Sequence, residues 1–199
     1  MENSLKIHLV AFNDDLHQAW QDCFADAEEV TVSHGDILSF NADAIVSPAN
    51  SFGYMDGGLD LKYSQFFGWE LERRLRAVLE EHHFGELPVG QAVIVETEHA
   101  EIPYLISAPT MRVPMRVADT ANAFLAFKAV LQTVQLFNRN GQRKITSILC
   151  PGLGTGEGKM PPERCAYQML KAYEICFRGE METRGGLAQA VRNHMDLLK

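Results

Sequence analysis

The sequence lacks the excess of basic residues that nucleic-acid binding needs. Its 18 lysines and arginines are outnumbered by 26 acidic residues, which leaves a formal net charge of -8. Binding to DNA or RNA draws on many lysine and arginine contacts with phosphates, so no direct nucleic-acid binding is expected. A small anionic ligand is still compatible with this charge, because backbone N–H groups can bind a phosphate without any basic side chain.

The sequence also lacks the residue spacings of common metal and hydrolase sites. Its four cysteines form no CxxC pair and lie in apolar patterns, which predicts buried thiols rather than disulfides or zinc ligands. Its seven histidines form neither HxxxH nor HExxH, so no metal or other cofactor is expected. No GxSxG segment indicates a serine hydrolase.

Long apolar runs are absent as well. No run approaches the roughly 18 apolar residues of a membrane span, and the first residues lack the apolar stretch of a signal peptide. We therefore expect a cytoplasmic protein without membrane contact. The length of 199 residues and the 46% hydrophobic content are typical of one globular domain over residues 1–199.

Apolar periodicity predicts strands that alternate with helices. Short apolar or alternating runs predict strands over residues 5–12, 30–33, 44–47, 92–96, 104–107 and 145–150. Apolar residues at helical spacing predict helices over residues 13–27, 58–83, 124–140, 161–177 and 187–198, of which the second is the longest. This order predicts an α/β protein whose mainly parallel sheet is covered on both faces.

Two glycine-rich turns suggest a phosphate site. The first, Gly57-Gly58, opens a predicted helix, and the second reads PGLGTGEG over residues 151–158, after a strand and before a helix. Glycine lets the backbone approach a ligand and turn its N–H groups inward, and a helix N-terminus adds a positive dipole end. A phosphate or diphosphate is the expected ligand, with a plain flexible turn as the alternative. A Walker ATP loop is disfavoured, because Leu153 and Met160 occupy two of its required positions.

Three polar residues near these turns have two interpretations each. Asp36 follows a strand and could accept the exocyclic amine of an adenine, or cap a turn. Asn50 ends the segment VSPAN and could orient a ribose hydroxyl, or hold a turn. Asp60 lies in the first turn of a helix and could activate a water, or complement the helix dipole. Ligands of such sheets bind outside the carboxyl ends of the strands, so these residues and loop 109–116 could line one crevice.

The order of these motifs resembles the macrodomain family over about residues 30–177: GDI, then VSPAN, then a glycine pair followed by Leu-Asp, then PGLGTG before a helix. The resemblance implies a three-layer α/β/α fold with a mixed, mostly parallel sheet of about six strands. It also implies a site for ADP-ribose, free or attached to a protein. Some members hydrolyse ADP-ribosyl or O-acyl-ADP-ribose esters. Residues 1–29 would then be an added strand and helix, and residues 178–199 a C-terminal helix.

The resemblance also implies a role for each matching residue. Asp36 and the Ile37 backbone would hold the adenine, and Asn50, next to Ala49, would contact the distal ribose. Asp60 lies where hydrolytic members often have an acid, so Asn50 and Asp60 are the expected catalytic residues. The diphosphate would lie between the two turns, which contribute Gly57, Gly58, Leu59, Gly154, Thr155, Gly156, Glu157 and Gly158.

The sequence departs from the family pattern in ways that leave two functions open. Members commonly end in a strand with an aromatic residue that packs on adenine, and no strand is predicted after residue 178. We hypothesise that residues 5–12 fill that place in a permuted order and that Phe12 stacks on the adenine, with plain core packing as its alternative. Lys159 and Met160 replace a glycine–aromatic pair, which would open the wall beside the distal ribose. The protein could therefore be a hydrolase in which Asp60 positions a water, or a reader that binds ADP-ribose without turnover.

Overall fold

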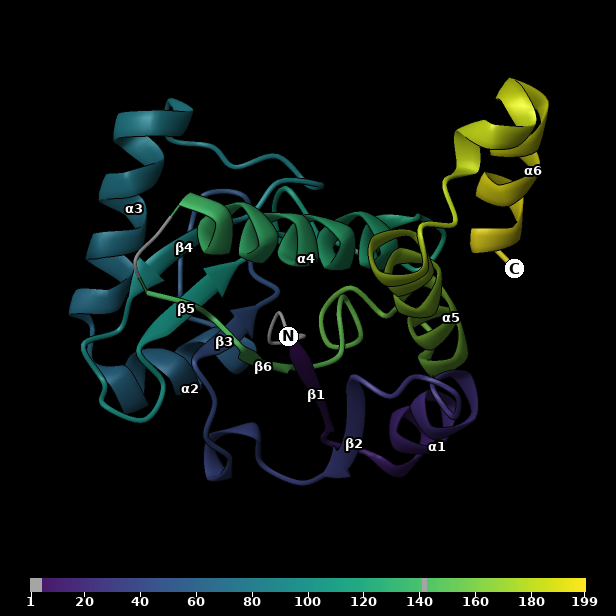
Figure 1. Ribbon diagram of the computed structural model, residues 1–199. Helices are drawn as coiled ribbons and strands as arrows, with labels where there is room; N and C mark the ends of the chain where they lie inside the picture. Colours follow the sequence, from purple (N-terminus) through teal and green to yellow (C-terminus); the bar gives the residue numbers. More distant parts are fainter. Residues whose placement is uncertain (1–4, 141–142) are drawn as a thin grey trace.

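The computed structural model, which describes residues 5–140 and 143–199, contains a six-stranded sheet with the order β2-β1-β6-β3-β5-β4 (Figure 1). Five strands run parallel, and β4 pairs antiparallel with β5 at one edge. The strands are β1 (Lys6–Ala11), β2 (Val30–His34), β3 (Ala44–Ser47), β4 (Val93–Glu96), β5 (Tyr104–Ser107) and β6 (Ser147–Cys150).

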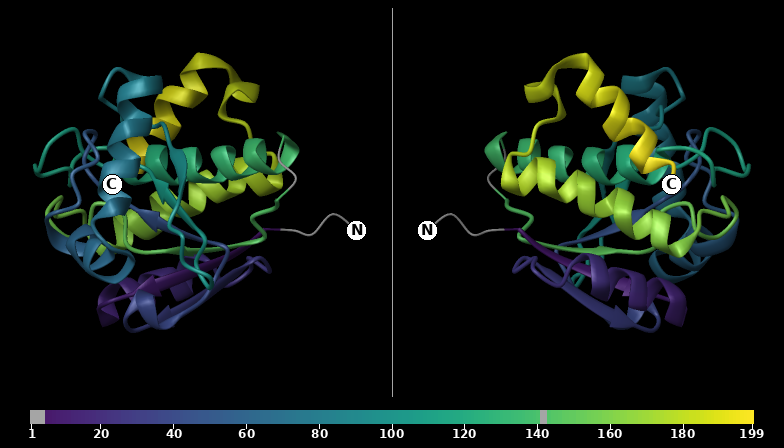
Figure 2. Two further views of the ribbon diagram at one scale, coloured as in Figure 1. Left: turned by 90° about the vertical axis from the view of Figure 1, so that its left-hand side faces the viewer. Right: turned by 90° about the vertical axis from the view of Figure 1, so that its right-hand side faces the viewer.

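Helices cover both faces of this sheet, which confirms the predicted three-layer α/β/α architecture. Successive strand residues point to opposite faces, so Leu9 packs in one apolar cluster and Val10 in the other. The first cluster is completed by α1 (Asp14–Cys23), α4 (Asn122–Asn140) and α5 (Pro162–Tyr173), and the second by α2 (Gly58–Phe67) and α3 (Glu70–His83). The helices α4 and α5 lie side by side (Figure 2), and α6 (Gly186–Leu197) stands apart from the sheet beyond α5 (Figure 1).

One predicted helix is wrong. The apolar stripe over residues 58–83 belongs to two helices, which separate at Gly68, where φ is 92°. That left-handed conformation interrupts the hydrogen-bond ladder of a helix. The stripe continues because Tyr63 before the break and Leu71 after it face the same apolar cluster. The longest helix is α4 instead, and its predicted stop at residue 141 lies outside the described residues.

Other boundaries shift by a few residues at helix ends. The first helix ends at Cys23, before the predicted residue 27, and Phe24 donates its N–H to the Trp20 carbonyl there. The helix that begins at Pro162 changes to a π-helical turn over Glu174–Arg178. A short 3-10 turn, Ile37–Ser39, follows β2, and another, Glu182–Gly185, precedes α6.

The N-terminal strand lies inside the sheet, between β2 and β6. Ile7 pairs with Val30 on one side and with Ile148 on the other, in both cases in parallel. The carboxyl ends of β1, β2, β3 and β6 therefore meet at the same edge of the sheet. Among the described helices, none has the length and apolarity needed to cross a membrane.

Candidate functional site

A cavity of about 580 Å³ opens at the edge where the parallel strands end. It is lined by the segments that follow β1, β2, β3 and β6, by the first turns of α2, and by Thr110, Met111 and Pro114 from the segment after β5. Ligand pockets for small molecules commonly have this size. Their usual place in parallel sheets is the carboxyl end of the strands, as here.

The structure brings the residues expected to bind the ligand or to catalyse the reaction into the lining of this one cavity, whereas Lys159 and Met160 lie outside it. The expected site residues are Phe12, Asp36, Ile37, Ala49, Asn50, Gly57, Gly58, Leu59, Asp60, Gly154, Thr155, Gly156, Glu157 and Gly158. Three more side chains that could bind a ligand or transfer a proton line the cavity and were not identified from the sequence: Tyr54, Asp56 and Lys62. Lys62 comes four residues after Gly58, which is one helical turn, so helical spacing alone could have identified it.

One end of the cavity combines an exposed ring with a carboxylate. Phe12 keeps 76% of its surface exposed, so plain core packing does not describe it. Asn13 caps α1 by accepting the Leu16 N–H at 2.9 Å. Asp36 caps the following 3-10 turn, because its Oδ1 accepts the Leu38 N–H at 3.1 Å. Its other oxygen accepts no hydrogen bond from any described residue, so Asp36 can serve both as a cap and as a ligand contact.

Asn50 holds the turn that begins at the end of the VSPAN segment. Its Nδ2 donates to the Tyr54 carbonyl at 2.8 Å, and its Oδ1 accepts the Phe52 N–H at 3.0 Å. This geometry matches the turn-holding interpretation of Asn50 and places Tyr54 at the cavity. An amide group has two N–H donors, so one of them is free for a ligand hydroxyl.

Asp60 is a buried acid at the start of α2. It is only 7% exposed, and its Oδ1 accepts a hydrogen bond of 2.6 Å from the Ser47 hydroxyl. Burial raises the pKa of Asp60 to about 7, against the smaller lowering effect of the Ser47 hydrogen bond. A carboxyl group that titrates near neutral pH can take or give a proton, which suits a general acid or base.

The second glycine turn is a closed loop rather than a flexible one. The Gly154 carbonyl accepts the Met160 N–H at 2.9 Å, and the Gly158 carbonyl accepts the Val117 N–H at 2.7 Å. Gly154 has a φ of 73°, which favours glycine. Met160 packs in the apolar core and does not line the cavity, so it does not form the wall that an aromatic residue would give beside the distal ribose, and the expected opening stays a prediction.

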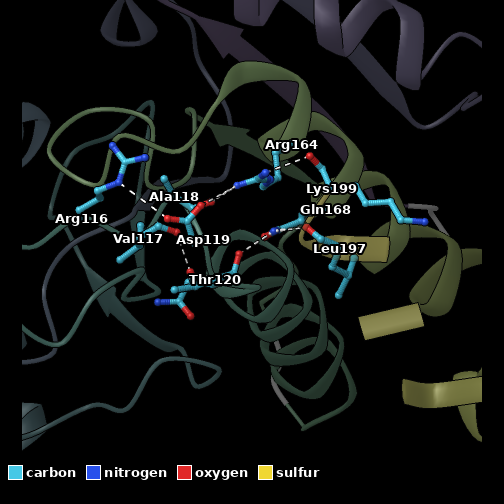
Figure 3. A network of polar contacts seen from close by, with 10 residues as sticks. Arg116, Val117, Ala118, Asp119, Thr120, Arg164, Gln168, Leu197 and Lys199 are labelled. Carbon is cyan, nitrogen blue, oxygen red and sulfur yellow. Dashed lines mark hydrogen bonds and ion pairs between the residues drawn. The ribbon is translucent and has the colours of Figure 1, made fainter. Parts of the chain in front are cut away.

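A polar network connects residues 116–120, whose Val117 bonds to this loop, to α5 and the end of α6 (Figure 3). The buried Gln168 of α5 accepts the Phe124 N–H at 3.1 Å and donates to the carbonyls of Thr120 and Leu197 at 2.7 and 2.8 Å. Arg164 donates to the carbonyls of Ala118 and Lys199. The segment that includes residues 117–120 thus supports the second glycine turn and is itself held by α5 and the end of α6.

A Gln168→Leu variant should lower the free energy of unfolding by ~1–3 kcal/mol, because a buried carbonyl, a partly buried carbonyl and a buried N–H lose their partner. The measurement is urea unfolding of the variant and the wild type. Gln18→Leu is the matched control, since Gln18 is exposed and its side chain donates to Asp22 within its own helix. Its expected change is within about 0.5 kcal/mol. Equal free energies of unfolding of the two variants would contradict a stabilising role for the Gln168 hydrogen bonds.

Charged groups in the lining are mostly acidic. Asp36, Asp56, Asp60 and Glu157 contribute carboxylates, and Lys62 contributes an ammonium. No group of three or more possible metal ligands occurs among residues 5–140 and 143–199. The arginines of loop 109–116 form ion pairs outside the cavity: Arg112 with Glu86 at 2.6 Å, and Arg116 with Asp119 at 3.9 Å.

Comparison with known proteins identifies one family model and several relatives that match most of this chain. The model of the Macro domain family matches residues 46–169. An uncharacterized protein of Aquifex aeolicus is 31% identical over 143 residues, which are 72% of this chain and 79% of the relative. A protein of Citrobacter koseri named O-acetyl-ADP-ribose deacetylase is 31% identical over 127 residues, which are 64% of this chain and 68% of the relative.

Solved structures share the fold at lower sequence identity. The macrodomain of Mycobacterium tuberculosis DarG has a TM-score of 0.57 and 22% identity, over 70% of this chain and 86% of that chain. The Oceanobacillus iheyensis macrodomain with ADP has a TM-score of 0.58 and 22% identity, over 69% of this chain and 70% of that chain. A glycine-to-valine mutant of the same macrodomain, solved with ADPR, has the same TM-score and identity, over 69% of this chain and 72% of that chain.

Proposed function

Because this chain belongs to the macrodomain family, we propose that it binds ADP-ribose or a derivative and hydrolyses an ADP-ribosyl or O-acyl-ADP-ribose ester. One observation carries the proposal: two glycine turns far apart in the sequence line a single cavity, together with Phe12, Asp36 and the buried Asp60. The relative named O-acetyl-ADP-ribose deacetylase supports the reaction class. The macrodomain neighbours solved with ADP and ADPR support the ligand class.

The proposed ligand pose follows the chemistry of the cavity wall. The purine lies against Phe12, where the free oxygen of Asp36 accepts its exocyclic amine. The diphosphate lies between the N-terminus of α2 at Gly57-Gly58 and the second glycine turn at residues 154–158, where backbone N–H groups bind it without basic side chains. The distal ribose then lies beside Ala49 and Asn50, at the other end of the cavity.

In the proposed reaction Asp60 positions a water and accepts its proton. The water oxygen forms a bond to the acyl or anomeric carbon of the ester, the carbon–oxygen bond of the leaving group breaks, and Asp60 gives the proton that it took from the water to the leaving oxygen. Because burial raises the pKa of Asp60 to about 7, its carboxyl group can change its protonation state near neutral pH. Most of the acceleration would come from holding water and ester in line and from the N–H groups around the diphosphate.

A reader that binds ADP-ribose without turnover is the second candidate. The observation that favours it is the position of Asp60, which is 7% exposed and has one oxygen taken by Ser47. A carboxylate so enclosed has limited room for a water as well as a substrate. Product analysis on ADP-ribosylated protein and on O-acetyl-ADP-ribose separates the two candidates, since a reader releases no product.

The binding step is tested by calorimetric titration with ADP-ribose. The wild type should bind it, and Asp36→Ala should bind it ~1–3 kcal/mol more weakly, because a charge-assisted hydrogen bond to the purine amine is lost. Asp15→Ala removes the same charge from an exposed position outside the cavity and should keep wild-type affinity. No binding by the wild type, or equal affinities of the two variants, would contradict the proposed ligand or its pose.

A further inference from the structure

Lys62 is the single cationic side chain among the described residues that line the cavity. It is exposed, and its Nζ lies 5.1 Å from the centroid of the Phe12 ring. No described carboxylate forms an ion pair with it, although four carboxylates line the same cavity. An ammonium without an ion-pair partner at a ligand site is available for an anionic group of the ligand.

The contact with Phe12 places this ammonium at one end of the cavity. Phe12, Asn13, Gly35 and Asp36 line that end, which the proposed function assigns to the purine. The two glycine turns already supply backbone N–H groups for the diphosphate. Lys62 extends from α2 to the Phe12 ring, so its charge lies next to the place proposed for the nucleoside.

We propose that Lys62 is a specificity-determining residue that selects ligands with an extra phosphate on the ribose next to the purine, the chemistry of an ADP-ribose 2′-phosphate. The proposal rests on the proposed function for the place of the nucleoside. In dinucleotide sites a basic side chain beside this ribose accommodates a 2′-phosphate. Lysine suits the role because its ammonium is a compact charge on a flexible stem that can move from the Phe12 ring to a phosphate.

The charges around the cavity explain why the selection would depend on this one residue. Asp36, Asp56, Asp60 and Glu157 make the cavity wall acidic, so an added phosphate is repelled unless a cation lies beside it. Loss of Lys62 should therefore turn a preference for the phosphorylated ligand into indifference or rejection.

Calorimetry with two ligands and three proteins tests the proposal. The wild type should bind ADP-ribose 2′-phosphate about fivefold more tightly than ADP-ribose, the upper end of the effect of one solvent-exposed charge contact. Lys62→Ala should abolish this ratio and change the affinity for ADP-ribose by less than about threefold. Lys159→Ala, which removes an exposed lysine outside the cavity lining, should keep the wild-type ratio. The preference should also shrink as salt is added.

Each other outcome overturns the proposal in a recognisable way. If Lys62→Ala lowers the affinity for both ligands equally, Lys62 contacts the diphosphate that both ligands share. If the wild type binds ADP-ribose but shows no preference, the selection is absent while the proposed function stands. If neither ligand binds to the wild type, the proposed function fails and the selection with it. Thermal unfolding of each variant, measured without ligand, confirms that the proteins compared are folded.

Discussion

An Asp60→Asn variant should lose turnover by at least ~10²-fold while it keeps its affinity for ADP-ribose. Asparagine has nearly the same shape as aspartate and can still accept the hydrogen bond of 2.6 Å from the Ser47 hydroxyl. It cannot take a proton from water. The measurement is product release from an ADP-ribosylated protein and from O-acetyl-ADP-ribose, beside calorimetric titration with ADP-ribose.

The same variant should change how stability depends on pH. Burial raises the pKa of Asp60 from its ordinary value of 3.8 to about 7 in the folded protein, so the folded state binds a proton that the unfolded state releases. The stabilising contribution of the protonated group is therefore complete below about pH 4 and is lost as the pH rises through about 7. Over this range the wild type should lose stability relative to Asp60→Asn, by on the order of 4 kcal/mol.

Urea unfolding at pH 4, 5.5 and 8 measures this difference. Asp56→Asn is the matched control, because Asp56 lines the same cavity but is exposed, and this variant keeps Asp60 and should therefore keep the pH dependence of the wild type. A wild type without turnover whose stability still follows this pH dependence would indicate a reader with a buried acid. Turnover that survives in Asp60→Asn would exclude this residue as the base.

The sequence predicted the strands best where burial on both faces leaves a short, continuous apolar run. The segments Ala44–Ser47 and Tyr104–Ser107 have the predicted bounds, and all their residues are buried. The break at Gly68 was missed because apolar spacing reports which side of a segment faces the core. It does not report whether the backbone between two such segments stays helical. The apolar stripe crosses the break without a change in spacing.

The candidate site also has features that the sequence predicts and features that it does not. Motif order and the parallel sheet were enough to predict that Asp36, Asn50 and the two glycine turns meet at one edge. The Ser47 hydrogen bond to Asp60 depends on how α2 packs against β3, and the bracing by Gln168 depends on contacts between segments distant in the sequence. Neither the Ser47–Asp60 hydrogen bond nor the Gln168 contacts can be detected from sequence periodicity. Each residue fits the pattern of its own helix or strand whether or not the other residue is present.

A Gly158→Ala variant should lose both stability and ligand affinity. The φ angle at Gly158 is not in the left-handed region, so the requirement for glycine comes from close approach alone. A Cβ there would lie 2.5 Å from the Gly154 carbonyl oxygen and 2.5 Å from Val117 Cγ2. Backbone must shift to admit it, at a cost of ~1–3 kcal/mol. The shift would turn the loop's N–H groups away from the proposed diphosphate position. ADP-ribose binding should therefore weaken by about tenfold or more, since such sites depend on preorganised donors.

Gly156→Ala separates these two effects. A Cβ at Gly156 meets no atom within 4 Å, so unfolding without ligand should match the wild type. Because Gly156 lines the cavity, its new methyl group would instead project toward any ligand that packs against the loop. Weaker binding by a fully stable Gly156→Ala protein would place the ligand at this turn. Wild-type affinity in the destabilised Gly158→Ala protein would mean that the second glycine turn shapes the fold but does not hold the diphosphate.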